Sequence, residues 1–554
     1  MTGDSTYTGG TTISAGTLQL GNGGTTGSVI GNITNNAHLV FDRGGVYTFT
    51  GVISGPGDVT VNGTGVTKFA QTQAYTGATF VESGELRAGA ANILGNTSGL
   101  TISPLAIFSA NGFDETVGNV VNNGIFNLFG IGPDNNITIT NLSGNGLFGM
   151  ITNMASYSGD HIAITGTSSG NHFLTVLNSG DAPADLSRTL ELVSTTDSSH
   201  GGATFKALGG EVDVGVYAYD IVQGNGSSRL PNTNNWYLAY DQGVVSNSAA
   251  AIINTAAAMS DIWFVQMDNL HRRMGQQRLD DPAAEPYDVW VRGYARNLNF
   301  DDSVSGQAFS EREEGVDTGI DTVLYHENGN TWIGGFFVGE GEAWRDFNDV
   351  GSTGDVITPY AGLYATWFDK SKYYIDIVTK VNRFYNTFNA EDASGNITHA
   401  DYENWGVGGS VEVGRRFKVG DNGWTVQPQA QVQYVYITGQ DYSTDRGDTV
   451  SVDGDNVFQT RIGLEGGKNI PDGKGGIFYP YARVSFIDRV SSGDNITADT
   501  LTFDPNVDGP GIEYGAGAIY QMDNQHQGYI AFVASNSEHY TQNWGVNLGF
   551  RYEF

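Results

Sequence analysis

The chain contains no cysteine and little positive charge. Cysteine is absent from all 554 residues, which excludes disulfide bonds, cysteine-ligated zinc and thiol catalysis. Lys and Arg number 27 against 60 Asp and Glu, so the net charge is −33 at pH 7. Nucleic-acid binding depends on cations that neutralise phosphates, so we do not expect this chain to bind nucleic acid.

Proline is scarce, at 13 residues, and long hydrophobic runs are missing. No stretch of about 18 consecutive apolar residues predicts a membrane-spanning helix. The first residues lack the basic segment and apolar core of a signal peptide. We therefore expect that a signal peptide and an upstream segment are not part of this sequence.

Glycine is abundant, at 78 residues, which is about twice its usual share of ~7%. Much of it stands beside Thr, Asn, Ser and Asp, the residues of turns, so the composition predicts many short strands. Aromatic residues make up 12% of the chain, which argues against disorder. The composition therefore favours an all-β protein.

One motif occurs twice near the start of the chain. Residues 7–21 read Tyr-Thr-Gly-x-Thr-x-Ile-x-x-Gly-x-Leu-x-x-Gly, and residues 75–89 repeat this pattern with Val in place of Ile. Each copy predicts a short strand, a turn and a second short strand. Repeated short strands without helices favour a stacked solenoid, here a right-handed parallel β-helix, and a β-sandwich is the alternative. Less repetitive strands after residue 130 are expected to cap its open edge.

A single helix is predicted between residues 246 and 279, a stretch with one Gly and no Pro. Basic residues near its end suit the helix dipole, and Pro282 stops it. About 30 residues make a helix of roughly 45 Å, which is longer than the hydrocarbon core of a membrane. Because the stretch is too polar for lipid, we expect a wet or protein-lined environment around it.

From Tyr287 onward, long segments alternate apolar and polar residues, as in Trp544, Val546 and Leu548 against Gly545 and Asn547. Segments of this length exceed the ~5–6 residues of an average strand and are typical of an outer-membrane barrel. Twelve strands are predicted, at residues 287–300, 314–326, 331–346, 354–368, 372–389, 400–418, 424–440, 454–468, 476–490, 511–522, 527–537 and 541–554.

The connections between these strands alternate in length. The even-to-odd connections are short and most odd-to-even connections are longer, which is the pattern of periplasmic turns and outer loops. If the β-solenoid lies outside the cell, the helix that precedes the first barrel strand must run through the pore. A polar lumen accommodates such a helix.

At this point the chain resembles a known family, the monomeric autotransporters of type Va secretion, in their pertactin-like group. The resemblance rests on the repeated motif at residues 7–21 and 75–89 and on local patterns further along the chain. These patterns are Gly159-Asp160-x-Ile162, Gly170-Asn171-His172, Leu190-x-Leu192-Val193, Val212-x-Val214-Gly215-x-Tyr217, Asn235-Trp236-Tyr237-Leu238, Trp290-Val291-Arg292-Gly293-Tyr294, Pro428-Gln429-Ala430-Gln431 and Tyr552-Glu553-Phe554.

The resemblance implies four domains. They are a β-helical passenger segment at residues 1–130, an autochaperone or capping region at 131–243, a lumenal linker helix at 244–284 and a 12-stranded outer-membrane translocator at 285–554.

It also implies a function. The translocator exports and displays its own passenger at the cell surface, and the autochaperone region aids passenger folding. The implied partners are outer-membrane lipid, lipopolysaccharide, the barrel assembly machinery and periplasmic chaperones, with host or neighbouring-cell ligands for the passenger. A monomer is expected, and no cofactor, metal or catalytic site.

Site residues follow from the resemblance and the strand pattern. The expected assembly signal is Trp544, Val546, Leu548, Phe550, Tyr552 and Phe554. Residues expected to face the barrel lumen are Arg292, Asp376, Lys380, Arg461, Glu465 and Arg483, and those expected to contact it from the helix are Arg272, Arg273 and Arg278.

Members of the family that cut themselves carry an Asn pair where this chain has Asp268-Asn269. In those members the first Asn side chain cyclises onto its own carbonyl. A carboxylate is a poor substitute for that amide nucleophile, so the resemblance implies no self-cleavage here. Alternatively, Asn269, Arg272 and Arg273 simply pair with lumen side chains such as Asp376 and Glu465.

Other constellations indicate no chemistry. His161 and His172 are not spaced as metal ligands, and Gly3-Asp4-Ser5-Thr6 lacks the context of a hydrolase serine. The acids Asp301, Asp302, Glu311, Glu313, Glu314 and Asp441 are interpreted as solvated loop charge.

Two alternatives to an exporter stay open. One is a surface adhesin whose barrel serves only as an anchor. The other is a plugged, porin-like channel, although open channels usually need ~16 strands or more. An enzyme upstream of this sequence would also escape notice.

Overall fold

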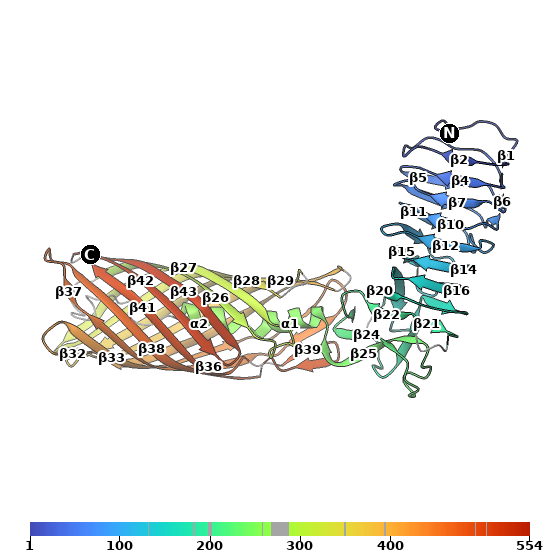
Figure 1. Cartoon of the computed structure of the whole chain (residues 1–554). Helices are drawn as coiled ribbons and strands as arrows, with labels where there is room; N and C mark the ends of the chain where they lie inside the picture. The colour runs from blue at the N-terminus through green and yellow to red at the C-terminus, as the bar shows by residue number, and fades with distance from the viewer. Residues whose placement is uncertain are drawn as a thin grey trace. The chain divides into compact units, whose positions relative to one another are not determined.

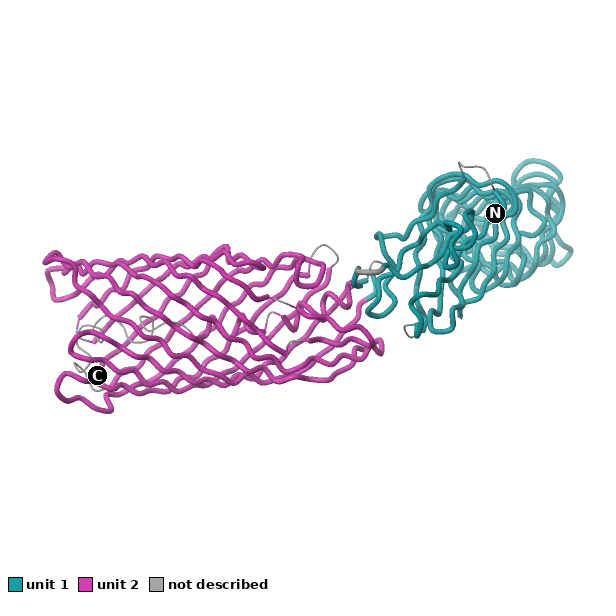
Figure 2. The backbone as a smooth tube through the Cα atoms, turned by 90° about the horizontal axis from the view of Figure 1, so that it is seen from below, with its two compact units in different colours: residues 1–246, 392–396 teal, residues 247–391, 397–554 magenta. Residues whose placement is uncertain are grey.

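The chain forms two compact units (Figure 2). Unit 1 comprises residues 1–246 and 392–396, and unit 2 comprises residues 247–391 and 397–554. The computed structural model describes all residues except 131, 181–182, 198–201, 258, 268–286, 348–350, 393–394, 494, 506 and 524, together with the side chains of 242–243.

Unit 1 is a parallel β-solenoid whose strands stack in three sheets (Figure 1). The first sheet contains β1 (Thr11–Ile13), β3 (Ile33–Asn35), β6 (Ile53–Gly55) and β9 (Ala74–Tyr75). The second contains β2 (Thr17–Leu20), β4 (His38–Phe41), β7 (Asp58–Val61), β10 (Thr79–Val81), β12 (Gly99–Ile102), β14 (Glu115–Asn122), β16 (Asn136–Gly144), β19 (His161–Ile164) and β21 (Thr189–Thr195). The third contains β5 (Val46–Phe49), β8 (Val66–Phe69), β11 (Glu85–Ala88), β13 (Ile107–Ser109), β15 (Ile125–Asn127), β17 (Leu147–Asn153), β20 (Asn171–Asn178) and β22 (Thr204–Ala207), with β18 (Ser158–Gly159) beside β17.

The repeated motif encodes a corner of the solenoid. In both copies the tyrosine hydroxyl is hydrogen-bonded to the threonine four residues later, Tyr7 to Thr11 at 2.6 Å and Tyr75 to Thr79 at 2.5 Å. The first copy lays its Thr-x-Ile strand in the first sheet, as β1, whereas the second lays its Thr-x-Val strand in the second sheet, as β10. The offset of 68 residues is therefore not a whole number of coils. As a result, the second copy begins in the second sheet and not in the first.

Aromatic side chains stack through the interior of the later coils. Neighbouring ring centroids in this stack lie 4.8–5.8 Å apart, which suits edge and offset packing. The series runs Phe108, Phe126, Phe148, His172, Phe205 and Trp236. Burial in this stack lowers the pKa of His172, because the charged ring is poorly solvated there.

Three antiparallel strands end the solenoid. β21 pairs with β25 (Trp236–Val245), which pairs with β24 (Tyr217–Gln223), which pairs with β23 (Val212–Val214). The reversal of strand direction covers an edge that would otherwise continue as parallel coils. Trp236 of β25 closes the aromatic stack on Phe205.

Unit 2 is a closed barrel of twelve antiparallel strands, as the alternating segments predict. The first barrel strand pairs with the last, and β31 pairs with β33 to complete the ring. The strands are β26 (Tyr287–Phe300), β27 (Phe309–Glu327), β28 (Asn330–Asp346), β29 (Thr353–Phe368), β30 (Tyr373–Glu391), β31 (Ile397–Arg415), β33 (Trp424–Ile437), β36 (Asp455–Lys468), β38 (Ile477–Ser492), β41 (Gly509–Gln521), β42 (His526–Ser537) and β43 (Tyr540–Glu553).

One expectation needs correction outside the barrel wall. The long connections after β33 and β38 are not plain loops, because they pair into a four-stranded sheet. That sheet contains β34 (Gln440–Ser443), β35 (Thr449–Val452), β39 (Ile496–Ala498) and β40 (Leu501–Phe503), and two short strands, β32 (Phe417–Val419) and β37 (Ile470–Pro471), extend the opposite turns. The predicted helix consists, in its described part, of α1 (Asn247–Ala257) and α2 (Met259–Gln266).

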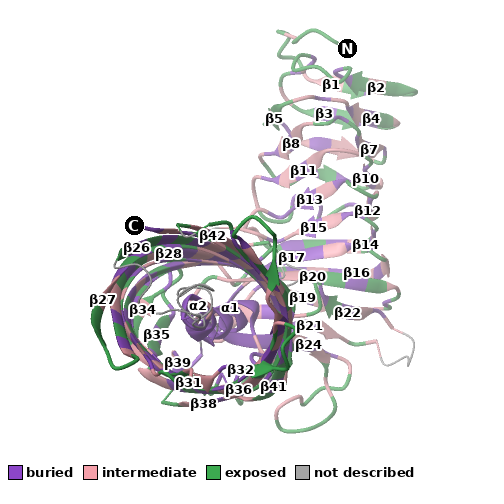
Figure 3. Cartoon of the chain, turned by 90° about the vertical axis from the view of Figure 1, so that its left-hand side faces the viewer, coloured by how far each residue is buried: buried purple, intermediate pink, exposed green. Residues whose placement is uncertain are grey.

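Glu311 and Glu313 are also not loop acids. β27 begins at Phe309, five residues earlier than expected, and both side chains are fully buried inside the barrel. Seen along the barrel, the buried residues of α1 and α2 lie within the ring of strands (Figure 3). Val316, Ile320, Phe336 and Leu363 are among the apolar residues exposed on the wall.

A buried acid should make the solenoid less stable as the pH rises. Glu115 is almost inaccessible, and its carboxylate accepts backbone N–H bonds from Ile93 and Leu94 at 3.2 and 3.4 Å. Burial nevertheless raises the pKa of Glu115 from 4.5 to about 8, so the folded state binds its proton more tightly than the unfolded state. The contribution to stability is complete below pH 4.5 and is lost as the pH rises toward 8.

Glu115→Gln should therefore flatten this pH dependence, which reaches at most about 1.4 kcal/mol per pH unit. The measurement is the urea midpoint for protease resistance of residues 1–246 between pH 5 and 8, with the exposed Glu82→Gln as control. Equal pH slopes in wild type and Glu115→Gln would contradict the assignment.

Candidate functional site

The candidate site is the barrel lumen together with the helices that occupy it. The stretch Asn247–Gln266 has a mean hydropathy of 1.3 and is long and apolar enough to cross a membrane, so it is less polar than we expected. Here 82% of it is buried inside the structure. The barrel wall therefore takes the place of lipid around α1 and α2.

Cations of the wall bind backbone carbonyl groups along the helix that α1 and α2 form. Arg345 donates to the carbonyl oxygen of Thr255 at 3.0 Å, near the end of α1. Lys380 and Arg292 donate to the carbonyl oxygens of Trp263 and Gln266 at 2.9 and 3.0 Å, at the end of α2. A cation is favourable beside a backbone carbonyl oxygen, because the oxygen carries partial negative charge.

Most of these cations also have a carboxylate partner on β27. Glu311, Glu313, Asp317 and Asp321 occupy alternating positions on this strand and are buried. The resulting buried ion pairs are Arg345–Glu311, Arg296–Glu313, Arg292–Asp317 and Arg551–Asp321, with Asp288 as a second partner of Arg551. The guanidinium groups of Arg292, Arg296 and Arg345 are thus each held in place by an acid of the wall.

One ion pair joins a helix side chain to the wall. The carboxylate of Asp261 in α2 accepts hydrogen bonds from Arg489 on β38 at 2.8 and 3.2 Å, and both side chains are buried. Arg296 donates to the carbonyl oxygen of the same residue at 2.7 Å. Because both partners are out of water, removing one leaves an uncompensated buried charge.

Trp263 of α2 docks against glycines of the wall. A side chain at Gly408 would place its Cβ 2.9 Å from the Trp263 ring, and one at Gly406 would place it 3.3 Å away. The Nζ atom of Lys380 lies 4.5 Å from the centre of the same ring, within cation–π range. The absence of side chains on β31 therefore makes room for the largest residue of the helix.

The lumen residues expected from the sequence lie at several places in this wall. Arg292 and Lys380 touch the helix, as described above. Asp376 accepts a hydrogen bond from Thr366 at 2.6 Å, and Glu465 accepts one from Tyr479 at 3.2 Å. Arg461 and Arg483 share Glu513. The helix residues Asp268, Asn269, Arg272, Arg273 and Arg278 lie outside the described part of the chain.

On the last strand, Trp544, Leu548, Phe550 and Phe554 are exposed, and Val546 and Tyr552 are half-buried. His161 lies 3.4 Å from Glu191, and His172 belongs to the aromatic stack of unit 1. Among the described residues, no group of three or more His, Asp or Glu side chains is arranged to hold a metal ion.

Several residues of the site were missed in the sequence. Asp261, Arg296, Arg345 and Arg489 form contacts across 34 to 228 positions of sequence, so no local motif marks their pairing. The acids of β27 did carry a signal. Glu311, Glu313, Asp317 and Asp321 are all odd-numbered, as expected for one face of a strand that begins before residue 311.

Known protein families match parts of both units. The family description "Autotransporter beta-domain" matches residues 289–532 and "Pertactin" matches residues 132–240. The "Passenger-associated-transport-repeat" matches residues 1–20 and 59–88. The repeat matches overlap the two motif copies, at residues 7–21 and 75–89.

Curated relatives match at moderate identity. The BrkA autotransporter of Bordetella pertussis is 29% identical over 424 residues, covering 76% of this chain and 40% of that protein. The pertactin autotransporter of Bordetella bronchiseptica is 26% identical, covering 76% of this chain and 49% of that protein. The autotransporter adhesin/invasin TibA of Escherichia coli is 26% identical, covering 92% of this chain and 60% of that protein.

Among solved structures, the beta domain of Bordetella BrkA is 26% identical with a TM-score of 0.42, covering 49% of this chain and all of that chain. This chain spans 35–49% of the length of BrkA, the Citrobacter rodentium autotransporter CRAC and pertactin. The family matches follow the order of the fold. The repeats and the pertactin region match unit 1, and the β-domain matches unit 2. The chain is therefore similar to the autotransporters, and to their pertactin-like group, in both units.

Proposed function

We propose that this chain exports its own β-solenoid passenger through the barrel and displays it on the cell surface. The barrel lies in the outer membrane, with the passenger outside. The observation that carries the proposal is the helix in the lumen, because residues 247–266 are mostly buried and lie within the ring of barrel strands (Figure 3). The wall cations that bind α1 and α2 then hold the exported chain in place after transit.

The proposal also assigns a function to each region of the chain. Residues 1–130 act as passenger and residues 131–243 as the autochaperone, with the antiparallel strands β21, β25, β24 and β23 as the template on which parallel coils stack. Residues 244–284 are the linker and residues 285–554 the translocator. This assignment is supported by the reversal of strand direction after β21.

The partners are proposed on chemical grounds. The exposed apolar residues of β43, including Leu548 and Phe550, form a ridge that suits recognition by the barrel assembly machinery before the wall closes. Periplasmic chaperones would cover the same surface during transit. The assembled chain acts as a monomer, in contact with outer-membrane lipid and lipopolysaccharide.

Two further functions are compatible with the same fold. TibA is named an adhesin/invasin, and the exposed faces of the solenoid offer a binding surface to a host or neighbouring cell. A plugged, porin-like channel is less well supported, because the lumen is filled by a bound helix. Neither BrkA nor pertactin is named as an enzyme, and we propose no enzymatic activity for this chain.

The passenger should remain attached to the barrel, because Asp268 provides no amide nucleophile. We expect outer-membrane fractions to contain one full-length species, seen by antibodies against both units and shifted on a gel by boiling. Surface protease should remove unit 1 from intact cells and leave the barrel. Two separate bands would contradict the role of Asp268, and a soluble chain without a shift would contradict the proposed function.

The plug should loosen when its buried ion pair is broken. Asp261→Asn leaves the Arg489 guanidinium without its acid, which costs about 3–5 kcal/mol for a buried pair. We expect more frequent openings in planar-bilayer recordings of the purified chain, with the boiling shift retained. The matched control is Glu314→Gln, which breaks the exposed pair Arg312–Glu314 at a cost of about 0–1 kcal/mol. Unchanged openings in Asp261→Asn would show that this pair does not hold the helix.

A further inference from the structure

Two cations lie on the outer face of the barrel wall, at the end where short turns join the strands. Arg415 is the last residue of β31 and Lys468 is the last residue of β36. The short strands β32 and β37 mark the same end of the barrel, opposite to β39 (Figure 1). Both side chains are half-buried and share a strand face with the exposed residues Val413 and Leu464, so they face away from the lumen.

Each cation lies against aromatic rings of the wall. The guanidinium carbon of Arg415 is 4.5 Å from the ring centre of Tyr373 and 4.6 Å from that of Phe417. The Nζ atom of Lys468 is 5.4 Å from the ring centre of Trp424. All three distances are within cation–π range. Aromatic girdles flank the apolar band of outer-membrane barrels, so the two cations lie where the wall leaves the hydrocarbon core.

No acid of the described chain pairs with either cation. Neither Arg415 nor Lys468 has a carboxylate within 4.0 Å among the residues that the structure describes. Three acids lie in the adjacent turns. Asp369 and Asp472 accept backbone N–H bonds within their own turns, and Asp421 is exposed at the tip of its turn. The two cations therefore remain available to an anion outside the protein.

Two exposed arginines at the loop end of the barrel are different. Arg312 pairs with Glu314 at 3.0 Å, and Arg383 pairs with Glu403. The guanidinium carbon of Arg383 also lies 4.6 Å from the ring centre of Trp405. Arg383 therefore shares the aromatic contact of Arg415 but has an acid as partner.

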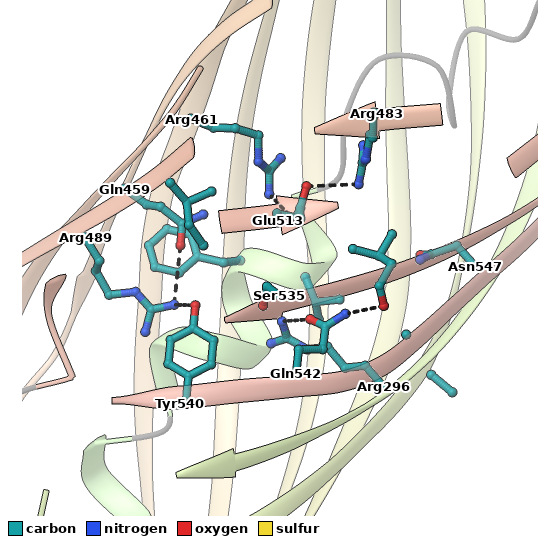
Figure 4. Close-up of a pocket in the computed structure, with 16 residues that line it drawn as sticks. Arg296, Gln459, Arg461, Arg483, Arg489, Glu513, Ser535, Tyr540, Gln542 and Asn547 are labelled. Atoms are coloured by element: carbon teal, nitrogen blue, oxygen red, sulfur yellow. Dashed lines mark hydrogen bonds and ion pairs between the residues drawn. The ribbon is translucent and has the colours of Figure 1, made fainter. Parts of the chain in front are cut away.

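The arginines of the lumen are closed to a ligand in the membrane. Arg296, Arg461, Arg483 and Arg489 line a small cavity beside α2 (Figure 4). The barrel wall separates this cavity from lipid, so these cations stabilise the interior of unit 2 instead.

The wall next to Arg415 and Lys468 is apolar. Val411 and Val413 of β31, and Ile462 and Leu464 of β36, are exposed on the same strand faces. A ligand that contacts the cations and this part of the wall must combine negative charge with apolar chains.

The turn end of the barrel faces the periplasm. α1 begins at the loop end, where Asn247 donates to the carbonyl oxygen of Glu391 at 3.2 Å and the Ser248 hydroxyl is 3.3 Å from that of Thr398. The passenger that precedes α1 lies outside the cell. The two cations at the opposite end therefore meet the periplasmic leaflet of the membrane.

We propose that the turn end of the barrel binds anionic glycerophospholipids, with headgroup phosphates on Arg415 and Lys468 and acyl chains along β31 and β36. Cations near a membrane surface attract anionic lipid, and each Lys or Arg raises the affinity about fivefold. The aromatic rings limit the movement of both cations and so favour one position of the headgroup. This lipid selectivity goes beyond export and display.

The test measures the temperature of the boiling shift for the purified full chain in neutral detergent micelles. Added phosphatidylglycerol should raise this temperature by about 2–4 °C, and the rise should saturate, whereas phosphatidylcholine with the same acyl chains should not raise it. Inorganic phosphate at the same concentration should also give no rise, which separates a lipid headgroup from a free phosphate. Because the measurement involves no export, its failure would leave the proposed function unaffected.

Variants locate the site. Arg415→Gln combined with Lys468→Gln should abolish the rise, and each single variant should weaken the apparent affinity for phosphatidylglycerol about fivefold. The matched control is Arg383→Gln, which removes a cation that contacts an aromatic ring and already has an acid, so it should keep the rise. Arg415→Lys combined with Lys468→Arg keeps both charges and should retain most of it.

A second measurement uses the wild-type chain in bilayers and decides the matter if the double variant fails to fold. A larger fraction of spin-labelled phosphatidylglycerol than of spin-labelled phosphatidylcholine should be immobilised at the wall, and the difference should shrink in 1 M salt, where the Debye length falls to about 3 Å. Equal shift temperatures with the two lipids, an equal rise with inorganic phosphate, a rise that persists in the folded double variant, or equal immobilised fractions would each overturn the proposal.

Discussion

The structure of unit 2 depends on buried cations that serve two partners at once. Arg345 and Arg292 each bind an acid of β27 on one side and a helix carbonyl group on the other. Without the acids, the guanidinium groups would be buried charges that no lumen of this size tolerates. Without the cations, the helix would lose its hydrogen bonds from the wall at Thr255, Trp263 and Gln266. The acids of one strand therefore determine where the helices sit.

Contact with backbone atoms makes this arrangement tolerant of the helix sequence. Arg292, Arg345 and Lys380 form four hydrogen bonds to the helix, and three of them go to backbone carbonyl oxygens, which every residue possesses. Specific fit comes from elsewhere, chiefly from Asp261 on Arg489 and from Trp263 on the glycines of β31. The wall thus binds the helix backbone through contacts that do not depend on sequence. It recognises this particular helix through Asp261 and Trp263.

The sequence predicted the repetitive parts of the fold well. Long alternation from Tyr287 onward is local information, and it yields twelve strands because each residue's face depends only on its neighbours. The start of β27 was misplaced because Glu311 and Glu313 read as solvent-exposed in isolation and are buried only opposite Arg345 and Arg296. The role of Arg489 was not predicted for the same reason, because its partner Asp261 lies 228 residues away in the sequence. The pairing of the outer connections into one sheet is likewise non-local. Asp268 and the rest of that segment lie outside the described residues, so expectations about them stay predictions.

The pairing of β26 with β43 bears on whether the helix enters the barrel before or after the barrel closes. The wall is a ring only once β26 has paired with β43. Until then the same strands form an open sheet with two free edges. A bulky residue such as Trp263 need not be drawn lengthwise through a finished tube of this width. The open sheet can instead curl around this side chain before β26 and β43 pair.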